Sequence, residues 1–182
     1  PPGSLVTRGF VGDNHGRLFR LDMTSDDPID WRAELFFDPS DSKWDSVIPS
    51  AVRYGAASYK PALAMGSSLT GHDLLVFYGL GERGDLNAGQ QKQLMIALQE
   101  DINVTLDSTD RATAKAEAQY LWHAEFEEPT YTNSKPTGGN AEKLTGAPVV
   151  FNKAVYFTTF VQPAANKCDP GWSRIYAMQF EG

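Results

Sequence analysis

Three oxygen-bearing side chains near the N-terminus have the chemistry to bind a hard cation. Asp13, Asn14 and Asp22 supply carboxylate and amide oxygens, which are the ligands that Ca²⁺ prefers in proteins. Their spacing does not match the twelve-residue loop of EF-hands. Asp and Asn also shape tight turns by accepting hydrogen bonds from the backbone, and this second interpretation is the favoured one. Ca²⁺ is the candidate ion here, and no cofactor is assigned with certainty.

The residues that commonly carry catalysis are scattered. His15, His72 and His123 are too dispersed for a zinc set, and a single cysteine excludes the paired-cysteine patterns. The chain has no Gly-x-Ser-x-Gly elbow, Walker loop or dinucleotide fingerprint. His123 follows Trp122 in an apolar run and is expected to be a packed residue. No catalytic or cofactor-binding residue is predicted, and the protein is expected not to be an enzyme.

A C-terminal polar segment holds the candidate partner contacts. Cys168 cannot form an internal disulfide, so it is either an unpaired thiol or bridged to a cysteine outside these residues. Trp172 lies near the end of the same segment, 162–173, and Arg174 follows directly after it. Because Trp and Arg are enriched at interaction hot spots, this segment is predicted to contact a partner protein.

Four blocks of strand-like sequence position these residues, at about 5–37, 47–80, 93–126 and 146–180. In the first block, apolar residues alternate with others around Phe19 and Leu21, which is the period of a strand. The last block contains strand runs broken by an Asn152-Lys153 turn. Between the strands of the third block, residues 110–119 contain four alanines and predict either a short helix, capped near Asp110, or a solvated loop.

The strand at 73–80 is apolar at nearly every position, which indicates a sheet covered on both faces. Antiparallel sheets stacked radially have this property, as in a β-propeller. Propeller repeats run at about 40–50 residues, so the chain is predicted to be an all-β, partial propeller of about four blades. A two-sheet β-sandwich is the alternative, because many short strands with turn signals suit it too.

Composition narrows the classes of partner. The chain has 182 residues, 41% of them hydrophobic and 21% charged, which is typical of a globular protein. A net charge of -7 without a basic run argues against nucleic-acid binding. No apolar run approaches the roughly 18–20 residues of a membrane span. The chain starts with Pro1, as a processed protein or an excerpt would.

Three segments, in order along the chain, resemble the PilC/PilY family of bacterial type IV pilus-tip adhesins. Residues 12–22 resemble its GDxxGxLWRFDL blade signature, and residues 50–54 followed by 75–86 are similar to its strand that ends in a GTGRY turn. Residues 155–160, then Cys168 and 173–177, resemble its late propeller motif VYFTTF…C…G…LYALD. The chain departs from the family at Leu80 and Glu82 and in its final strand, which ends Ala-Met-Gln-Phe.

The resemblance implies that residues 1–182 are one region, the C-terminal portion of a larger propeller domain. It implies a non-enzymatic protein that is exported through the periplasm to the cell surface or pilus tip, where it acts in pilus assembly and adhesion. Minor pilins or other tip subunits would be its partners, and the remainder of the propeller or another chain would cover the open blades. The family can carry a calcium loop, but no match to it is found here.

Two other functions remain open. A quinoprotein-like dehydrogenase also uses propeller strands of this kind, although its adjacent cysteine pair is missing. A propeller that binds partners unrelated to pili is the third alternative, since fold does not determine function.

Overall fold

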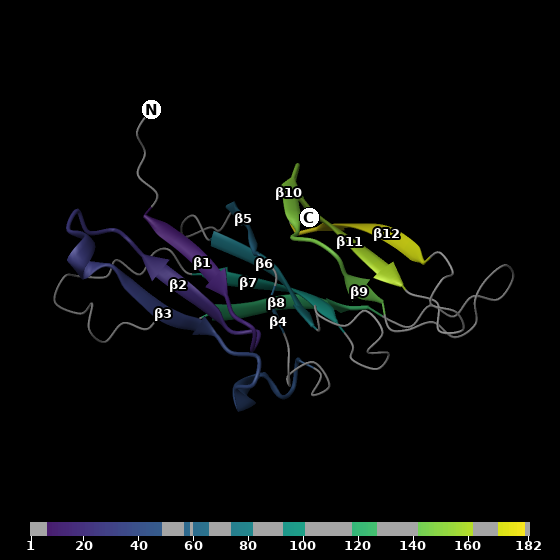
Figure 1. Cartoon of the computed structure of the whole chain (residues 1–182), viewed down its shortest axis with the longest axis horizontal. Helices are drawn as coiled ribbons and strands as arrows, with labels where there is room; N and C mark the ends of the chain where they lie inside the picture. The colour runs from purple at the N-terminus through teal and green to yellow at the C-terminus, as the bar shows by residue number, and fades with distance from the viewer. Residues whose placement is uncertain are drawn as a thin grey trace, which may run out of the picture.

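The computed structural model describes residues 7–48, 57–58, 60–65, 74–81, 93–100, 118–126, 142–161 and 171–180. These residues form twelve β-strands and two 3₁₀ helices and contain no α-helix (Figure 1). All strand pairs are antiparallel, and they make three separate sheets. The prediction of an all-β protein is confirmed, and no helix of the described residues is long and apolar enough to cross a membrane.

The first sheet contains β1 (Arg8–Gly12), β2 (Leu18–Asp22) and β3 (Arg32–Phe37) in chain order. A shift in register opposite Leu18 lets the consecutive residues Phe36 and Phe37 both be buried, which regular alternation would prevent. The first 3₁₀ helix, η1 (Pro28–Asp30), lies between β2 and β3, and the second, η2 (Ser42–Trp44), follows β3.

The middle sheet is built around β6 (Leu74–Gly81), which pairs with β7 (Leu94–Glu100), and β7 pairs in turn with β8 (Ala118–Glu125). Two shorter strands, β4 (Ala57–Ser58) and β5 (Ala62–Met65), pair with the other edge of β6. The strand predicted at 73–80 is therefore confirmed as a central strand.

The last sheet comprises β9 (Lys143–Leu144), β10 (Val149–Phe151), β11 (Ala154–Val161) and β12 (Trp172–Gln179). Both β9 and β10 pair with one edge of β11, and β12 pairs with the other. The β10–β11 hairpin closes through the Asn-Lys pair at 152–153, with φ angles of 47° and 62°. Positive φ at both central residues is the type I′ geometry of two-residue hairpins, so the predicted turn is confirmed.

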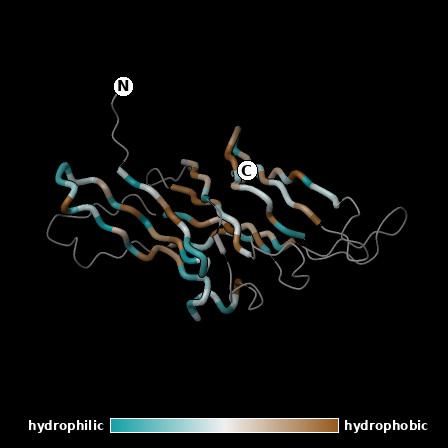
Figure 2. Tube along the Cα trace, in the orientation of Figure 1, coloured by the Kyte–Doolittle hydropathy of each residue, from teal (hydrophilic) through white to brown (hydrophobic). Residues whose placement is uncertain are grey.

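The three sheets stack face to face, and the middle sheet is buried on both sides. Figure 2 shows hydrophobic residues along the strands of the middle sheet. Alternate residues of β6 and β7 point to opposite faces and enter two different cores. The core between the first and middle sheets contains Leu18, Phe36, Phe37, Trp44, Ile48, Val76, Tyr78, Leu80, Leu94, Ile96, Leu98 and Ala118. The core between the middle and last sheets contains Leu75, Phe77, Met95, Ala97, Phe126, Leu144, Val155 and Phe157.

Two sequence predictions need correction. The second and third predicted blocks are not separate blades, because β6 and β7 pair along their whole lengths and join them in one sheet. Ala118 and Gln119, which end the segment considered as a helix, begin β8 instead, and the rest of that segment lies outside the described residues. A two-sheet sandwich describes either neighbouring pair of sheets, but it leaves the third sheet unaccounted for.

The core between the middle and last sheets generates a prediction for Phe77, which is fully buried. Its ring packs against those of Trp122 and Phe180, at centroid distances of 6.0 and 5.0 Å. We expect Phe77→Ala to lower the free energy of unfolding by about 3–5 kcal/mol, because a large aromatic side chain leaves a cavity. Ile29→Ala, at an exposed position of η1, is the control and should change it by less than about 0.5 kcal/mol. Urea unfolding measures both, and equal effects would contradict the burial of Phe77 between the middle and last sheets.

Candidate functional site

The candidate calcium ligands do not come together. Asp13 follows β1 at the hairpin turn, whereas Asp22 ends β2 and pairs across the sheet with Arg8, at the opposite end of the hairpin. Asp13 Oδ1 accepts hydrogen bonds from the backbone N–H groups of His15 and Arg17, both at 2.9 Å, and Oδ2 pairs with the Arg17 guanidinium at 2.7 Å. The structure therefore separates Asp13 and Asn14 from Asp22 and favours the turn interpretation.

The pKa directions agree with this role for the aspartates. Partial burial would raise the pKa of Asp13, but hydrogen bonds from Arg17 and His15 outweigh it and hold the pKa below 3.8.

The polar loop after β3 is organised in the same way, since the Asp41 carboxylate accepts a hydrogen bond from Lys43 N at 3.0 Å and caps η2. Within the described part of the chain no group of three or more His, Cys, Asp or Glu side chains could hold a metal ion.

The predicted partner contacts lie on a strand and not on a loop. Trp172 and Arg174 are the first and third residues of β12, and both are partly buried on the side that faces the middle sheet. The Arg174 guanidinium contacts the Glu142 carboxylate at 3.2 Å. Whether they contact a partner stays a prediction, and Cys168 lies outside the described residues.

Glu142 is the centre of a buried polar cluster in the last sheet. Its side chain is almost completely buried, and the Tyr176 hydroxyl lies 2.9 and 3.0 Å from its two carboxylate oxygens. The Thr159 hydroxyl and Arg174 also donate to this carboxylate. The cluster joins the residue before β9 to β11 and β12, and such charge-assisted bonds compensate for the desolvation of the carboxylate.

A second buried cluster connects the first and middle sheets. Arg20 of β2 and Glu100 of β7 form an ion pair, and both side chains are nearly inaccessible. Arg8 lies 3.5 Å from Glu100, while Asp22 and Glu34 lie 3.9 and 3.7 Å from Arg20. Burial raises the pKa of Glu100, and the nearby guanidinium groups of Arg20 and Arg8 oppose this only in part.

His123 packs against the Tyr120 ring, as expected of a packed residue, and its imidazole also has polar contacts. The Tyr120 hydroxyl lies 2.7 Å from His123 Nδ1, and His123 Nε2 lies 3.4 Å from Glu125 Oε1. A register shift in β8 brings Tyr120 to the same face as His123, so these contacts depend on an irregularity that sequence alternation does not indicate. All three residues lie on β8, at the edge of the middle sheet, and the imidazole is partly exposed.

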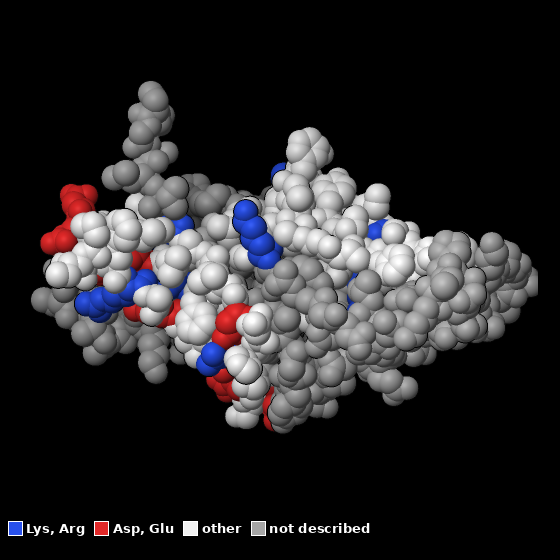
Figure 3. Space-filling model, viewed as in Figure 1, with Lys and Arg blue, Asp and Glu red and all other residues white. Residues whose placement is uncertain are grey.

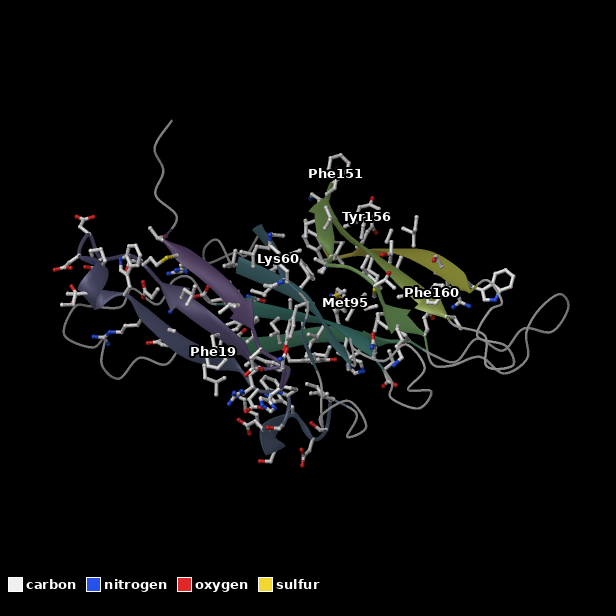
Figure 4. The ribbon with its side chains drawn as sticks, viewed as in Figure 1. Phe19, Lys60, Met95, Phe151, Tyr156 and Phe160 are labelled. Atoms are coloured by element: carbon white, nitrogen blue, oxygen red, sulfur yellow. The ribbon has the colours of Figure 1, made fainter. Side chains whose placement is uncertain are left out.

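The last sheet presents an apolar face to solvent, which we call the last-sheet outer face: Val149, Phe151, Tyr156, Thr158, Ser173, Ile175 and Ala177. Among these, Ile175 is 78% exposed, Phe151 70% and Val149 62%. Figure 4 shows Phe151 and Tyr156 at the end of this sheet where β10 pairs with β11. The outward positions of β10, β11 and β12 are uncharged, whereas Lys143 of β9 pairs with Phe160 on the same side of the sheet and is buried.

The opposite end of the stack presents a second such surface, the first-sheet outer face: Gly9, Val11, Phe19, Leu21, Ala33 and Leu35. β2 points Phe19 and Leu21 outward while it buries Arg20, so the more apolar side of the strand is the uncovered one. Acidic residues lie around η1 (Figure 3), and the Arg17 guanidinium lies over the Phe19 ring, 5.6 Å from its centroid. Val11 and Leu35 are each about half exposed.

These two faces are the strongest candidates for a functional site. Adjacent exposed apolar residues on one face of a sheet are typical of a surface that another protein covers. A sheet face that stays in contact with water carries mainly polar and charged residues. Of the two buried clusters, the Arg20–Glu100 pair joins the first and middle sheets, whereas the Glu142 cluster joins strands within the last sheet. No family model, curated protein or solved structure matches this chain.

The Glu142 cluster predicts a specific stability effect. Tyr176→Phe removes a hydroxyl that donates to a buried carboxylate, so we expect the free energy of unfolding to fall by about 1.5–3 kcal/mol. Tyr156→Phe is the matched control, because Tyr156 lies on the outer face of the same sheet. Chemical denaturation compares the two variants, and equal effects would show that the hydroxyl of Tyr176 adds nothing.

Glu100 predicts a pH dependence. Its folded-state pKa is raised above 4.5, so the folded protein holds this proton more tightly than the unfolded chain. The contribution of Glu100 to the free energy of unfolding is therefore greatest below the unfolded pKa and decreases as pH rises through the folded pKa. Comparing the wild type with Glu100→Gln in denaturant series from about pH 4 to about pH 7 isolates this contribution. The wild type should lose stability relative to the variant across that range, and a relative gain would contradict the raised pKa.

Proposed function

We propose that this chain is part of a β-propeller of a type IV pilus-tip protein, which acts through protein–protein contacts and not through catalysis. The observation that carries the proposal is the pair of exposed, largely apolar faces at the two ends of a stack of sheets. A propeller blade has the same need, because each blade is covered by a neighbour on both sides.

The arrangement of the sheets supports this architecture. Each sheet has its strands in chain order, as a meander, and each follows the preceding sheet in the stack. The middle and last sheets approach most closely along one edge, where β5 lies near β10 and β6 lies near β9. Sheets that converge along one edge fan out around an axis, which is the geometry of propeller blades.

The family resemblance supports the pilus assignment. The segment 12–22 supplies the β1–β2 turn and β2, and the segment 75–86 includes most of β6. The segments 155–160 and 173–177 supply paired stretches of β11 and β12. The resembling motifs thus contribute to all three sheets. In this proposal the protein is exported through the periplasm and sits at the cell surface or pilus tip, with minor pilins or other tip subunits as partners.

The test is a genetic one in a piliated bacterium that carries this gene. We expect deletion of the segment that encodes residues 7–180 to reduce surface pili and attachment several-fold, and Ile175→Asp to reduce them in part. Ile29→Asp, an equally exposed position outside both faces, is the matched control. Electron microscopy counts the pili, and immunoblotting of sheared filaments quantifies pilin. Unchanged piliation and attachment after the deletion would overturn the proposal.

A further inference from the structure

We propose that His123 and Glu125 of β8 bind a divalent transition-metal ion of the zinc type, through His123 Nε2 and a Glu125 carboxylate oxygen, with the Tyr120 hydroxyl orienting the imidazole. This site is independent of the proposed pilus function. It also differs in chemistry from the calcium site considered in the first sheet, because imidazole nitrogen suits zinc-type ions, whereas Ca²⁺ takes oxygen ligands.

The separation of the two ligand atoms suits a shared metal ion. His123 Nε2 lies 3.4 Å from Glu125 Oε1, whereas the two heavy atoms of an N–H···O hydrogen bond are usually about 2.7–3.2 Å apart. Zinc lies about 2.0–2.2 Å from its nitrogen and oxygen ligands, and at the tetrahedral angle two such ligands are about 3.4 Å apart. An ion therefore fits between these two atoms at the separation that they already have.

The strand holds both side chains on one face and within reach of solvent. His123 and Glu125 are two residues apart, so the pleat of β8 points them to the same side, opposite Ile96 and Leu94 of β7. Their side chains are 20% and 30% exposed. No third His, Cys, Asp or Glu among the described residues completes the set, so water would occupy the other coordination positions. With two protein ligands, we expect reversible binding that a chelator removes.

Tyr120 supplies the contact that selects the metal-binding nitrogen. Its hydroxyl oxygen lies 2.7 Å from His123 Nδ1. When Nδ1 carries the proton and donates it to this oxygen, the lone pair of Nε2 is available to a metal ion. Histidines that bind metals almost always donate their other ring N–H to such a partner. The register shift in β8 brings Tyr120 to this face, and the Trp44 ring packs against the phenol at a centroid distance of 6.5 Å.

Titration calorimetry of the untagged 182-residue chain with ZnCl₂ tests the site. We expect saturable zinc binding that a large excess of Ca²⁺ or Mg²⁺ does not displace, because those ions prefer oxygen ligands. His123→Gln and Glu125→Gln should each weaken this binding by at least about tenfold, since each removes a ligand, and Tyr120→Phe by about tenfold, since it removes only the orienting contact. His15→Gln, at an exposed turn position, is the matched control and should bind zinc as the wild type does. Circular dichroism verifies that all four variants are folded.

Nitrogen-15 NMR of the histidine side chains identifies the ligand atom. With zinc, His123 should carry its proton on Nδ1 and show the shift change of metal binding at Nε2, and Tyr120→Phe should lower the share of the Nδ1-protonated tautomer. A wild type without saturable zinc binding, zinc bound at Nδ1, or undiminished binding by His123→Gln or Glu125→Gln would overturn the inference. Undiminished binding by Tyr120→Phe would contradict its orienting role. None of these results bears on the pilus proposal, which fails only if piliation and attachment survive the deletion.

Discussion

Burial of the middle sheet on both faces is the constraint on which the other parts of the structure depend. Even-numbered residues of β6 and β7 enter the core shared with the first sheet, and odd-numbered residues enter the core shared with the last. A slip of one residue in this pairing would exchange the two sets of side chains. The first and last sheets are therefore held in place by a single register, which extends from Leu74–Glu100 to Leu80–Leu94.

Polar side chains at the two junctions add specificity to this apolar packing. Arg20 pairs with Glu100 across the first junction, and Gln93 accepts a hydrogen bond from Leu144 N at 2.6 Å across the second. Buried ion pairs add little net stability, but a wrong arrangement would leave their charges unpaired. Gly81 also matters here, because its φ is 146° and a Cβ would lie 2.1 Å from Gln93 Cγ. These contacts join the three sheets between the two outer faces.

The sequence predicted local features better than it predicted how they assemble. The apolar run of β6 and the Asn152-Lys153 turn are both short-range signals, and the structure confirms them. The pairing of β6 with β7 joins two predicted blocks across a long connection, so strand periodicity could not reveal it. The Arg20–Glu100 pair was missed for the same reason. Alternation in β2 was visible, but periodicity does not tell which side of a strand is covered.

The two-residue turn of the β10–β11 hairpin also influences the order in which the chain can fold. Short loops close at the lowest entropic cost, and an isolated hairpin forms within microseconds. The middle sheet needs much longer closures, across residues 82–93 and 101–117. The hairpin can thus form before the surface that covers Val155 and Phe157 exists. During that interval the chain exposes apolar strands that aggregate readily. Its yield of folded protein then depends on how quickly the middle sheet is completed, a kinetic requirement that equilibrium stability does not reveal.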